Sequence, residues 1–294
     1  MNSKYYLIIA LFYCFSSFAQ IQRVDTIQCK IETVATLPKS LTEISGMVYT
    51  KDGFWVHNDG DNGPFIMLLQ NDGTIKSIKK ITNAPNYDWE DMAIDPAGNL
   101  FVGDIGNNNN NRRKLQIYKI SKPLATESLR IESEKIEFDY PDQKDFPPKA
   151  SQLKYDAEAM IFFNDSIFIF SKNRTRPYDG YLRMYKLPAK PGKYHAMLSD
   201  SILLGGKSML NSWVTGADIS NDGKKLAMLS HDKIWVFENF EGSHFFKGKL
   251  RVLKLNHFSQ KEAICFDAKG DIFVADEVFE RILGGKLYRI TASK

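Results

Sequence analysis

The chain has 294 residues, of which 43% are hydrophobic and 25% are charged, and its formal net charge is +4. This composition can supply a large buried core and excludes a disordered protein. The charge is too small for a nucleic-acid footprint, no basic run is longer than residues 112–114, and three cysteines exclude a disulfide-framed fold.

The first nineteen residues have the pattern of a secretory signal peptide. Lys4 precedes an apolar run at residues 5–15, and Ser17 and Ala19 are small residues placed for a cut after Ala19. The apolar run is shorter than the roughly 20 residues of a spanning helix. We therefore expect an extracytoplasmic protein, periplasmic or secreted, with residues 20–294 as one domain. The two cysteines beyond the cut, Cys29 and Cys265, are expected to be free or buried thiols.

After a strand-like segment at residues 29–37, one sequence unit recurs five times, at residues 43–59, 89–104, 157–172, 214–231 and 261–276. Each copy has an apolar run, a turn containing Gly, Asn or Asp, and a second apolar run, which is the pattern of a β-hairpin. We expect third strands at residues 65–69, 115–120, 182–187, 234–237 and 286–290. Fourth strands are expected at residues 75–81, 129–138, 201–204 and 249–255, so that the last copy lacks one.

This repeat predicts an all-β fold, a β-propeller of five four-stranded blades. Residues 29–37 have the length to supply the missing fourth strand, which would close the ring by pairing the two ends of the chain and remove exposed sheet edges. A β-sandwich is disfavoured by the fixed unit. Six blades are the alternative if residues 140–155 hide irregular strands, although Pro141, Pro147 and Pro148 are more typical of a loop.

In such a fold, the start of each first strand and the end of each second strand meet at one face, the mouth of the central channel. The glutamates expected there are Glu43, Glu90, Glu158 and Glu262, with Thr215 in the fourth copy. The residues expected at the ends of the second strands are Asp59, Asp104, Lys172, His231 and Asp276. The pairs Glu90–Asp104, Glu158–Lys172 and Glu262–Asp276 share one spacing of fourteen residues, which predicts equivalent places around the mouth.

Carboxylates that converge on a narrow opening repel one another unless a cation lies among them. Ca²⁺ or another divalent cation is therefore a candidate, with Glu90, Glu158, Glu262 and Asp276 as its ligands. In the alternative interpretation, the glutamates accept hydrogen bonds from backbone amides of the neighbouring blade and are purely structural. The residues at the second-strand ends vary more between copies, which favours contact with a ligand.

Basic side chains come after two of the second strands and are expected above the acidic ring. This mixed charge suits a small anionic ligand, such as a phosphate or a carboxylate. The residues predicted to bind it are Asp59, Asp104, Arg112, Lys172, Arg174 and Asp276. No serine nucleophile elbow, HExxH motif or paired CxxC motif is present, so no motif indicates an enzyme.

Four segments carry a resemblance to known proteins: residues 41–47 (LTEISGM), 88–93 (DWEDMA), 101–107 (FVGDIGN) and 261–264 (KEAI). With them the chain resembles the SdiA-regulated, NHL-like β-propellers and, more distantly, the esterase-like phytases and the SMP-30/gluconolactonase propellers. The latter resemblance implies a divalent metal in the channel, for which Glu43 or Glu90, Asn173 and Asp276 are the nearest equivalents.

The sequence supports three hypotheses. The first is a monomeric, extracytoplasmic propeller that binds a small or surface ligand at the mouth. The second is a metal-dependent hydrolase, either a phosphoesterase or a lactonase, in which Glu90, Glu262 and Asp276 hold the ion and His231 or Glu43 acts as the base. Glu43, Glu90 and His231 are thus its catalytic candidates. The third is a structural interaction scaffold.

Overall fold

The computed structural model describes residues 24–204, 208–280 and 283–292, and the predicted signal peptide lies outside them. The described residues form strands and three short 3-10 turns, η1 (Pro123–Ala125), η2 (Ala150–Gln152) and η3 (Phe245–Lys247). The prediction of an all-β chain is confirmed. Within these ranges, no helix has the length and apolar character needed to cross a membrane.

Each sequence repeat forms an antiparallel unit of four strands, and we number these units 1 to 5. Unit 1 contains β2 (Ile44–Thr50), β3 (Gly53–Asn58), β4 (Phe65–Leu69) and β5 (Ile75–Ile81). Unit 2 contains β6 (Trp89–Ile94), β7 (Leu100–Asp104), β8 (Leu115–Ile120) and β10 (Glu134–Asp139). Unit 3 contains β11 (Ala157–Phe163), β12 (Ser166–Ser171), β13 (Tyr181–Pro188) and β15 (Met197–Leu203).

Unit 4 contains β16 (Gly216–Ile219), β17 (Lys225–Leu229), β18 (Lys233–Glu238) and β19 (Lys249–Lys254). Unit 5 contains β20 (Lys261–Phe266), β21 (Ile272–Asp276), β24 (Lys286–Ala292) and the N-terminal strand β1 (Asp25–Thr36). Strand β1 pairs with β24 in antiparallel register, so the segment predicted at residues 29–37 does supply the outer strand of the last unit.

The hydrogen-bonded sheets do not, however, match five separate four-stranded blades. Strand β9 (Arg130–Ile131) pairs in parallel with β5 of unit 1, and β14 (Gly192–His195) pairs in parallel with β10 of unit 2. Strand β1 also pairs in parallel with β19, so units 4 and 5 form one eight-stranded sheet. The fourth strand predicted at residues 129–138 is split for the same reason, because its first part leaves unit 2 to extend unit 1.

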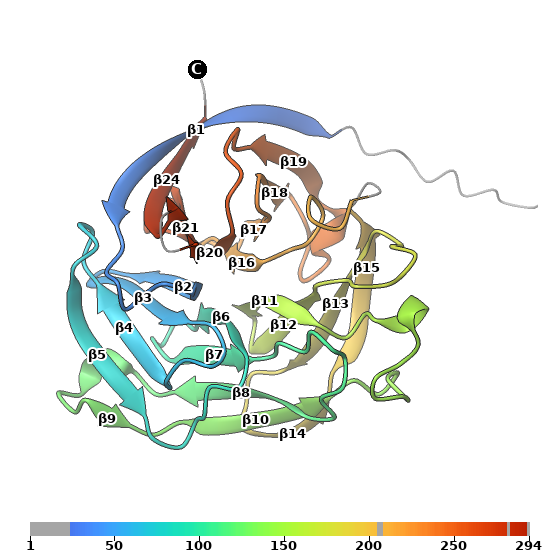
Figure 1. The fold of residues 1–294 in the computed structure, drawn as a ribbon, viewed down its shortest axis with the longest axis horizontal. Coiled ribbons are helices and arrows are strands. Elements are labelled where there is room, and N and C mark those ends of the chain that lie inside the picture. Colours follow the sequence, from blue (N-terminus) through green and yellow to red (C-terminus); the bar gives the residue numbers. More distant parts are fainter. Residues whose placement is uncertain (1–23, 205–207, 281–282, 293–294) are drawn as a thin grey trace, which may run out of the picture.

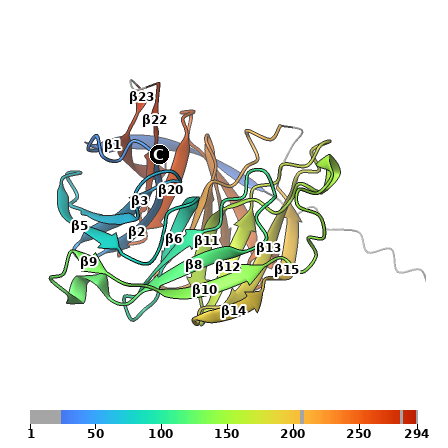
Figure 2. The same ribbon diagram turned by 60° about the horizontal axis from the view of Figure 1, so that its bottom comes forward.

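Figure 1 shows the five units around a common centre, with β2, β6, β11, β16 and β20 innermost. Each inner strand contacts the next in this order, and β20 contacts β2. Residues 140–155 hold only η2 and add no strand, so the described chain has no sixth unit. The hairpin of β22 (Val278–Phe279) and β23 (Leu283–Gly284) comes after unit 5's second strand and stands at the top of Figure 2.

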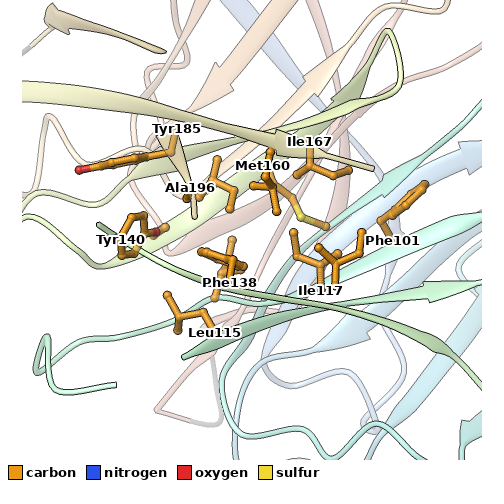
Figure 3. Close-up of a cluster of buried hydrophobic side chains, with 14 of the residues drawn as sticks. Phe101, Leu115, Ile117, Phe138, Tyr140, Met160, Ile167, Tyr185 and Ala196 are labelled. Atoms are coloured by element: carbon orange, nitrogen blue, oxygen red, sulfur yellow. The ribbon is translucent and has the colours of Figure 1, made fainter. Parts of the chain in front are cut away.

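The hydrophobic core is divided into clusters that lie between neighbouring units. Figure 3 shows the cluster between units 2 and 3, where Phe101, Ile117 and Phe138 face Met160 and Ile167. Corresponding clusters join units 1 and 2, 3 and 4, 4 and 5, and 5 and 1. Because every unit is packed against both of its neighbours, inner strands such as β3 and β20 are buried along their whole length, whereas the outer strand β5 alternates between buried and more exposed residues.

Cys29 and Cys265 are both buried and free, as predicted. They belong to different core clusters, which is consistent with thiols that pack as small apolar side chains.

Candidate functional site

The inner strands of four units begin with an irregular register, and the acidic residues of the mouth lie there. In units 2, 3 and 5, cross-strand pairing skips one residue, which is Glu90, Glu158 or Glu262. A residue in a β-bulge leaves the ladder, so its side chain can be aimed away from the sheet. These three glutamates are buried, with exposed fractions of 2%, 4% and 6%. We call this end of the ring the mouth.

In unit 1 the bulged residue is Ser45, not the predicted Glu43. Ser45 donates its hydroxyl hydrogen bond to the backbone carbonyl of Glu90 in the next unit. Thr215 precedes β16 in unit 4 and makes the same kind of bond to the carbonyl of Lys261 (2.6 Å). Glu43 lies two residues before the bulge, is exposed, and accepts a hydrogen bond from Asn62 (2.7 Å).

A second set of mouth residues follows the second strands, one position after the strand in units 1, 2, 3 and 5 and two positions after β17 in unit 4. The last residue of the second strand pairs with the residue just before the bulge in each of four units: Ile44 with Asn58, Trp89 with Asp104, Ala157 with Ser171 and Lys261 with Asp276. The residue that follows the second strand therefore takes the same place at the mouth in each of these units. These residues are Asp59, Ile105, Lys172 and Glu277, with His231 in unit 4. Asp59, Lys172 and His231 were predicted there, whereas Ile105 and Glu277 were missed.

The structure places the predicted ligand residues Asp104 and Asp276 one position earlier, where they serve the scaffold. Asp276 accepts hydrogen bonds from the Tyr288 hydroxyl (2.9 Å) and the Lys286 amide (2.9 Å). Asp104 accepts one from the Asp88 amide (3.1 Å) and pairs with Arg112 (2.8 Å). Fourteen residues after the bulge glutamate is the mouth position only in unit 3, whose hairpin turn is short. The same count in units 2 and 5 therefore selected Asp104 and Asp276, each one residue too early.

Three carboxylates from three different units converge at the mouth. Carboxylate oxygens of Asp59, Glu90 and Glu262 all lie within 4.8 Å of one another. Glu90 Oε2 is buried without a hydrogen-bond partner among the described residues. Burial, reinforced for Glu90 by Glu158 and Asp59, raises the pKa of Glu90 and of Glu262, and burial raises the pKa of Asp59 to about 6.

Further carboxylates surround this cluster. Burial and the neighbouring Asp59 and Asp156 raise the pKa of Asp88 to about 7. Burial, followed by repulsion from Glu262 and Asp59, raises the pKa of Glu277 to about 9. The mouth therefore holds more carboxyl groups than basic groups, and burial and mutual repulsion favour the protonated form of several of them, so that a bound cation would take the place of these protons.

The basic groups lie on the side of unit 3. Lys172 donates to Glu158 Oε1, and Arg174 Nη2 lies 3.6 Å from the same oxygen. Burial alone would lower the pKa of Lys172, but Glu158, Glu262 and other carboxylates raise it above its ordinary value. The Trp213 ring faces both cations, with its centroid 5.0 Å from the Lys172 nitrogen and 5.1 Å from the Arg174 guanidinium carbon.

The two predicted arginines are partly engaged by the protein itself. Arg174 Nε donates to Asp156, and its Nη2 donates to Asn108. Arg112 donates to Asp104 and to the Gly106 carbonyl (2.6 Å), which fixes the loop after β7. Arg174 faces the mouth carboxylate Glu158, whereas Arg112 braces a loop beside it.

His231, the predicted base, is 6% exposed and lies at the mouth position of unit 4. Its Nδ1 has no hydrogen-bond partner among the described residues. Burial and the nearby Lys172 and Lys261 lower its pKa to about 4, so the imidazole is neutral at pH 7.

Backbone amides of neighbouring units are bound by aspartates that the sequence did not single out. Asp91, the residue after Glu90, accepts from the amides of Met92 (2.8 Å), Met160 (2.8 Å) and Ala217 (3.2 Å), and so ties units 2, 3 and 4 together. Asp218 accepts from the Phe266 amide (2.7 Å) of unit 5. No described amide donates to the carboxylates of the three bulge glutamates, which leaves them for other partners.

No protein-family model and no curated protein matches the chain. Among solved structures, the chain is similar to a gluconolactonase from Xanthomonas campestris, with 10% sequence identity and a TM-score of 0.44. The alignment covers 90% of this chain and 89% of that chain.

Proposed function

We propose that this protein is an exported five-bladed β-propeller that binds a divalent cation at its mouth and holds a small anionic ligand beside it. The observation that carries the proposal is the convergence of Asp59, Glu90 and Glu262 within 4.8 Å, with one buried oxygen of Glu90 lacking a described partner. Three buried or half-buried carboxylates are held this close together at a lower free energy when a cation lies among them.

The donor set fits a hard cation. All three groups offer carboxylate oxygen, which Ca²⁺ and Mg²⁺ prefer, and each comes from a different unit, so the site depends on the assembled ring. Of the predicted ligands, Glu90 and Glu262 belong to this set. Glu158 lies outside this set and pairs through Oε1 with Lys172, and Asp276 lies outside it and accepts two scaffold hydrogen bonds, so we exclude both. When bound, the ion would neutralise the cluster and polarise an oxygen of the ligand.

The anionic ligand is assigned to the unit 3 side of the mouth. There the Lys172 ammonium and the Arg174 guanidinium face Glu158 and the Trp213 ring. A phosphate or carboxylate placed between these cations and the bound metal would contact positive charge on both sides.

Calorimetric titration of residues 20–294 with Ca²⁺, Mg²⁺ and Mn²⁺ tests the cation site. We expect at least one ion to bind with sub-millimolar affinity, and Glu90→Gln to weaken it by tenfold or more. Glu43→Gln is the matched control, because Glu43 lies nearby but is exposed and outside the cluster. Failure of all three ions to bind, or equal binding by Glu90→Gln, would refute the site.

A metal-dependent hydrolase is the second candidate, favoured by the neutral His231 with its free Nδ1 at the mouth. A neutral imidazole can accept a proton from an attacking water. Phosphomonoesters and lactones would be tested with added metal, and His231→Gln should lower turnover while cation binding is unchanged. Absent turnover would leave binding as the function, and turnover that survives this substitution would exclude His231 as the base.

We further propose that residues 1–19 direct export, that the mature protein is a monomer without a nucleic-acid partner, and that it belongs with the SdiA-regulated propellers. The pattern around Lys4 and Ala19 supports the first point, and the small net charge supports the absence of a nucleic-acid partner. Signal cleavage can be tested by sequencing the N-terminus of the protein from an expressing cell, and the monomer by light scattering.

A further inference from the structure

A second concave site lies at the end of the ring opposite the mouth. Here the inner strands end in their hairpin turns, and a cavity of about 480 Å³ opens between them. Every unit contributes to its lining, which includes Tyr49 of unit 1, Ile94 of unit 2, Phe162 of unit 3, Ile219 of unit 4 and Phe266 of unit 5. The volume is that of a pocket for a small molecule.

The lining combines aromatic rings with carboxylates. Its rings are held by neighbours outside the cavity: Phe162 stacks on Phe101 with centroids 5.5 Å apart, and Tyr49 packs edgewise on Phe54 at 5.2 Å. Its three acidic residues are Asp95, Asp218 and Asp222, and the lining contains no Lys, Arg or His. The lining differs in this from the mouth, where the side chains of Lys172 and Arg174 lie beside the carboxylates.

Two of these carboxylates present their charge at the rim. The Ser220 hydroxyl and the Lys224 amide hold the pKa of Asp222 below its ordinary value, so it is ionised at neutral pH. Asp95 accepts only uncharged donors, both from Asn99 (2.8 and 2.7 Å). Asp218 instead accepts hydrogen bonds from the Ile219 and Phe266 amides, one with each carboxylate oxygen, and so belongs to the scaffold.

We propose that this cavity binds a small organic cation, an ammonium group carrying an apolar body. The aromatic rings would cover the apolar body and attract the cation through their faces. The carboxylates of Asp95 and Asp222 would supply charge complementarity; the lining itself contains no basic side chain, and Lys224 and Lys225, which act on Asp222, lie outside it. An anion or a neutral polar molecule would lack both contributions.

The test uses benzyltrimethylammonium as the probe and benzenesulfonate as the anion of similar size, each titrated calorimetrically into residues 20–294. We expect the cation to bind and the sulfonate not to bind. The double variant Asp95→Asn, Asp222→Asn should weaken binding by about tenfold, because it removes two charges and keeps the turn-forming acceptor oxygens. Asp267→Asn is the matched control, since Asp267 accepts the same kind of turn bonds outside this cavity.

Two further variants locate the bound probe. Ile219→Trp should fill the cavity and abolish binding, and it replaces the double variant if that protein does not fold. Glu90→Gln, at the mouth, should bind the probe as the wild type does. The proposal is overturned if the wild type does not bind the cation at millimolar concentration, if benzenesulfonate binds equally, or if Glu90→Gln loses binding while the cavity variants retain it.

Discussion

Replacement of Asp91 should both destabilise the fold and disturb the mouth. Its side chain is fully buried, and its two oxygens accept backbone hydrogen bonds from β6, β11 and β16, the inner strands of three units. It also comes directly after Glu90, so the same contacts fix the bulge that carries the mouth carboxylate. Asp91→Ala removes the acceptor and leaves the Met160 and Ala217 amides buried without it.

The magnitude can be worked out from these three bonds. Burial raises the pKa of Asp91 well above its ordinary value, against the effect of its three amide donors, so the values for a charged acceptor do not apply in full. A lost hydrogen bond costs roughly 0.5–1.5 kcal/mol, and each amide left buried without an acceptor costs roughly 1–3 kcal/mol. We therefore expect Asp91→Ala to lower the free energy of unfolding by about 4 kcal/mol. In a domain of this size, that loss corresponds to a fall of roughly 10 °C in Tm. Asp91→Asn keeps one acceptor oxygen, which suits the Met160 and Ala217 amides, and should cost about 1–2 kcal/mol.

Urea unfolding and scanning calorimetry of residues 20–294 would measure these losses, and calorimetric titration would measure cation affinity. Asp218→Ala is the matched control, because Asp218 accepts only one bond from another unit and should cost about 2 kcal/mol. Asp91→Ala should also bind Ca²⁺ more weakly than the wild type. The reasoning fails if Asp91→Ala melts within about 2 °C of the wild type, or if Asp218→Ala costs more than Asp91→Ala.

Three other predictions concern the charges of the mouth. Lys172→Met leaves Glu158 buried without its main partner and should lower the free energy of unfolding by about 3–5 kcal/mol in urea titrations, with most of the loss recovered by adding Glu158→Gln. The pKa values of Asp59 (about 6) and Asp88 (about 7) are raised, so the folded protein retains protons that the unfolded chain releases. The contribution of these two groups to stability is therefore present near pH 4 and lost as the pH rises through 6–7. In thermal melts with EDTA, the Tm of the double variant Asp59→Asn, Asp88→Asn should fall less between pH 4.5 and pH 8 than the Tm of the wild type. Ca²⁺ at about 100 times its Kd should stabilise the wild type by about 2.7 kcal/mol at pH 8, and at the same concentration it should stabilise Glu90→Gln, whose affinity is at least tenfold lower, by about 1.4 kcal/mol or less, as measured by calorimetry.

Much of the fold could be read from the sequence because the scaffold repeats. Every unit must bury the same inner strands, so apolar runs and turns recur, and the predicted strands at residues 65–69, 75–81 and 115–120 match β4, β5 and β8. The parallel additions of β9 and β14 could not be predicted, because they are short segments between repeats that bond to strands remote in sequence. Their pairing depends on how the units pack.

The site was predicted in its residue types and partly misplaced in its positions. Bulges and turn lengths decide which residue reaches the mouth, and a count of residues along the chain does not reveal either one. The count therefore selected Asp104 and Asp276 in place of Ile105 and Glu277. Glu43 was selected as the glutamate of the first copy although its distance from Asp59 departs from that count, and the bulged residue is Ser45. Asp91 was missed because it directly follows Glu90 in the sequence, and nothing in the sequence indicates the amides that it meets from two other units.

The three bulge glutamates differ in chemistry because a different residue stands just after the second strand in each of their units. In unit 3 that residue is Lys172, which converts Glu158 into an ion pair. In unit 2 it is the buried, apolar Ile105, which offers Glu90 no charge to pair with. In unit 5 it is Glu277, whose carboxylate adds to that of Glu262. One repeated position thus yields a basic side and an acidic side of the same mouth. We propose that this asymmetry is what would allow a metal ion and an anion to be held next to each other in a ring of similar units.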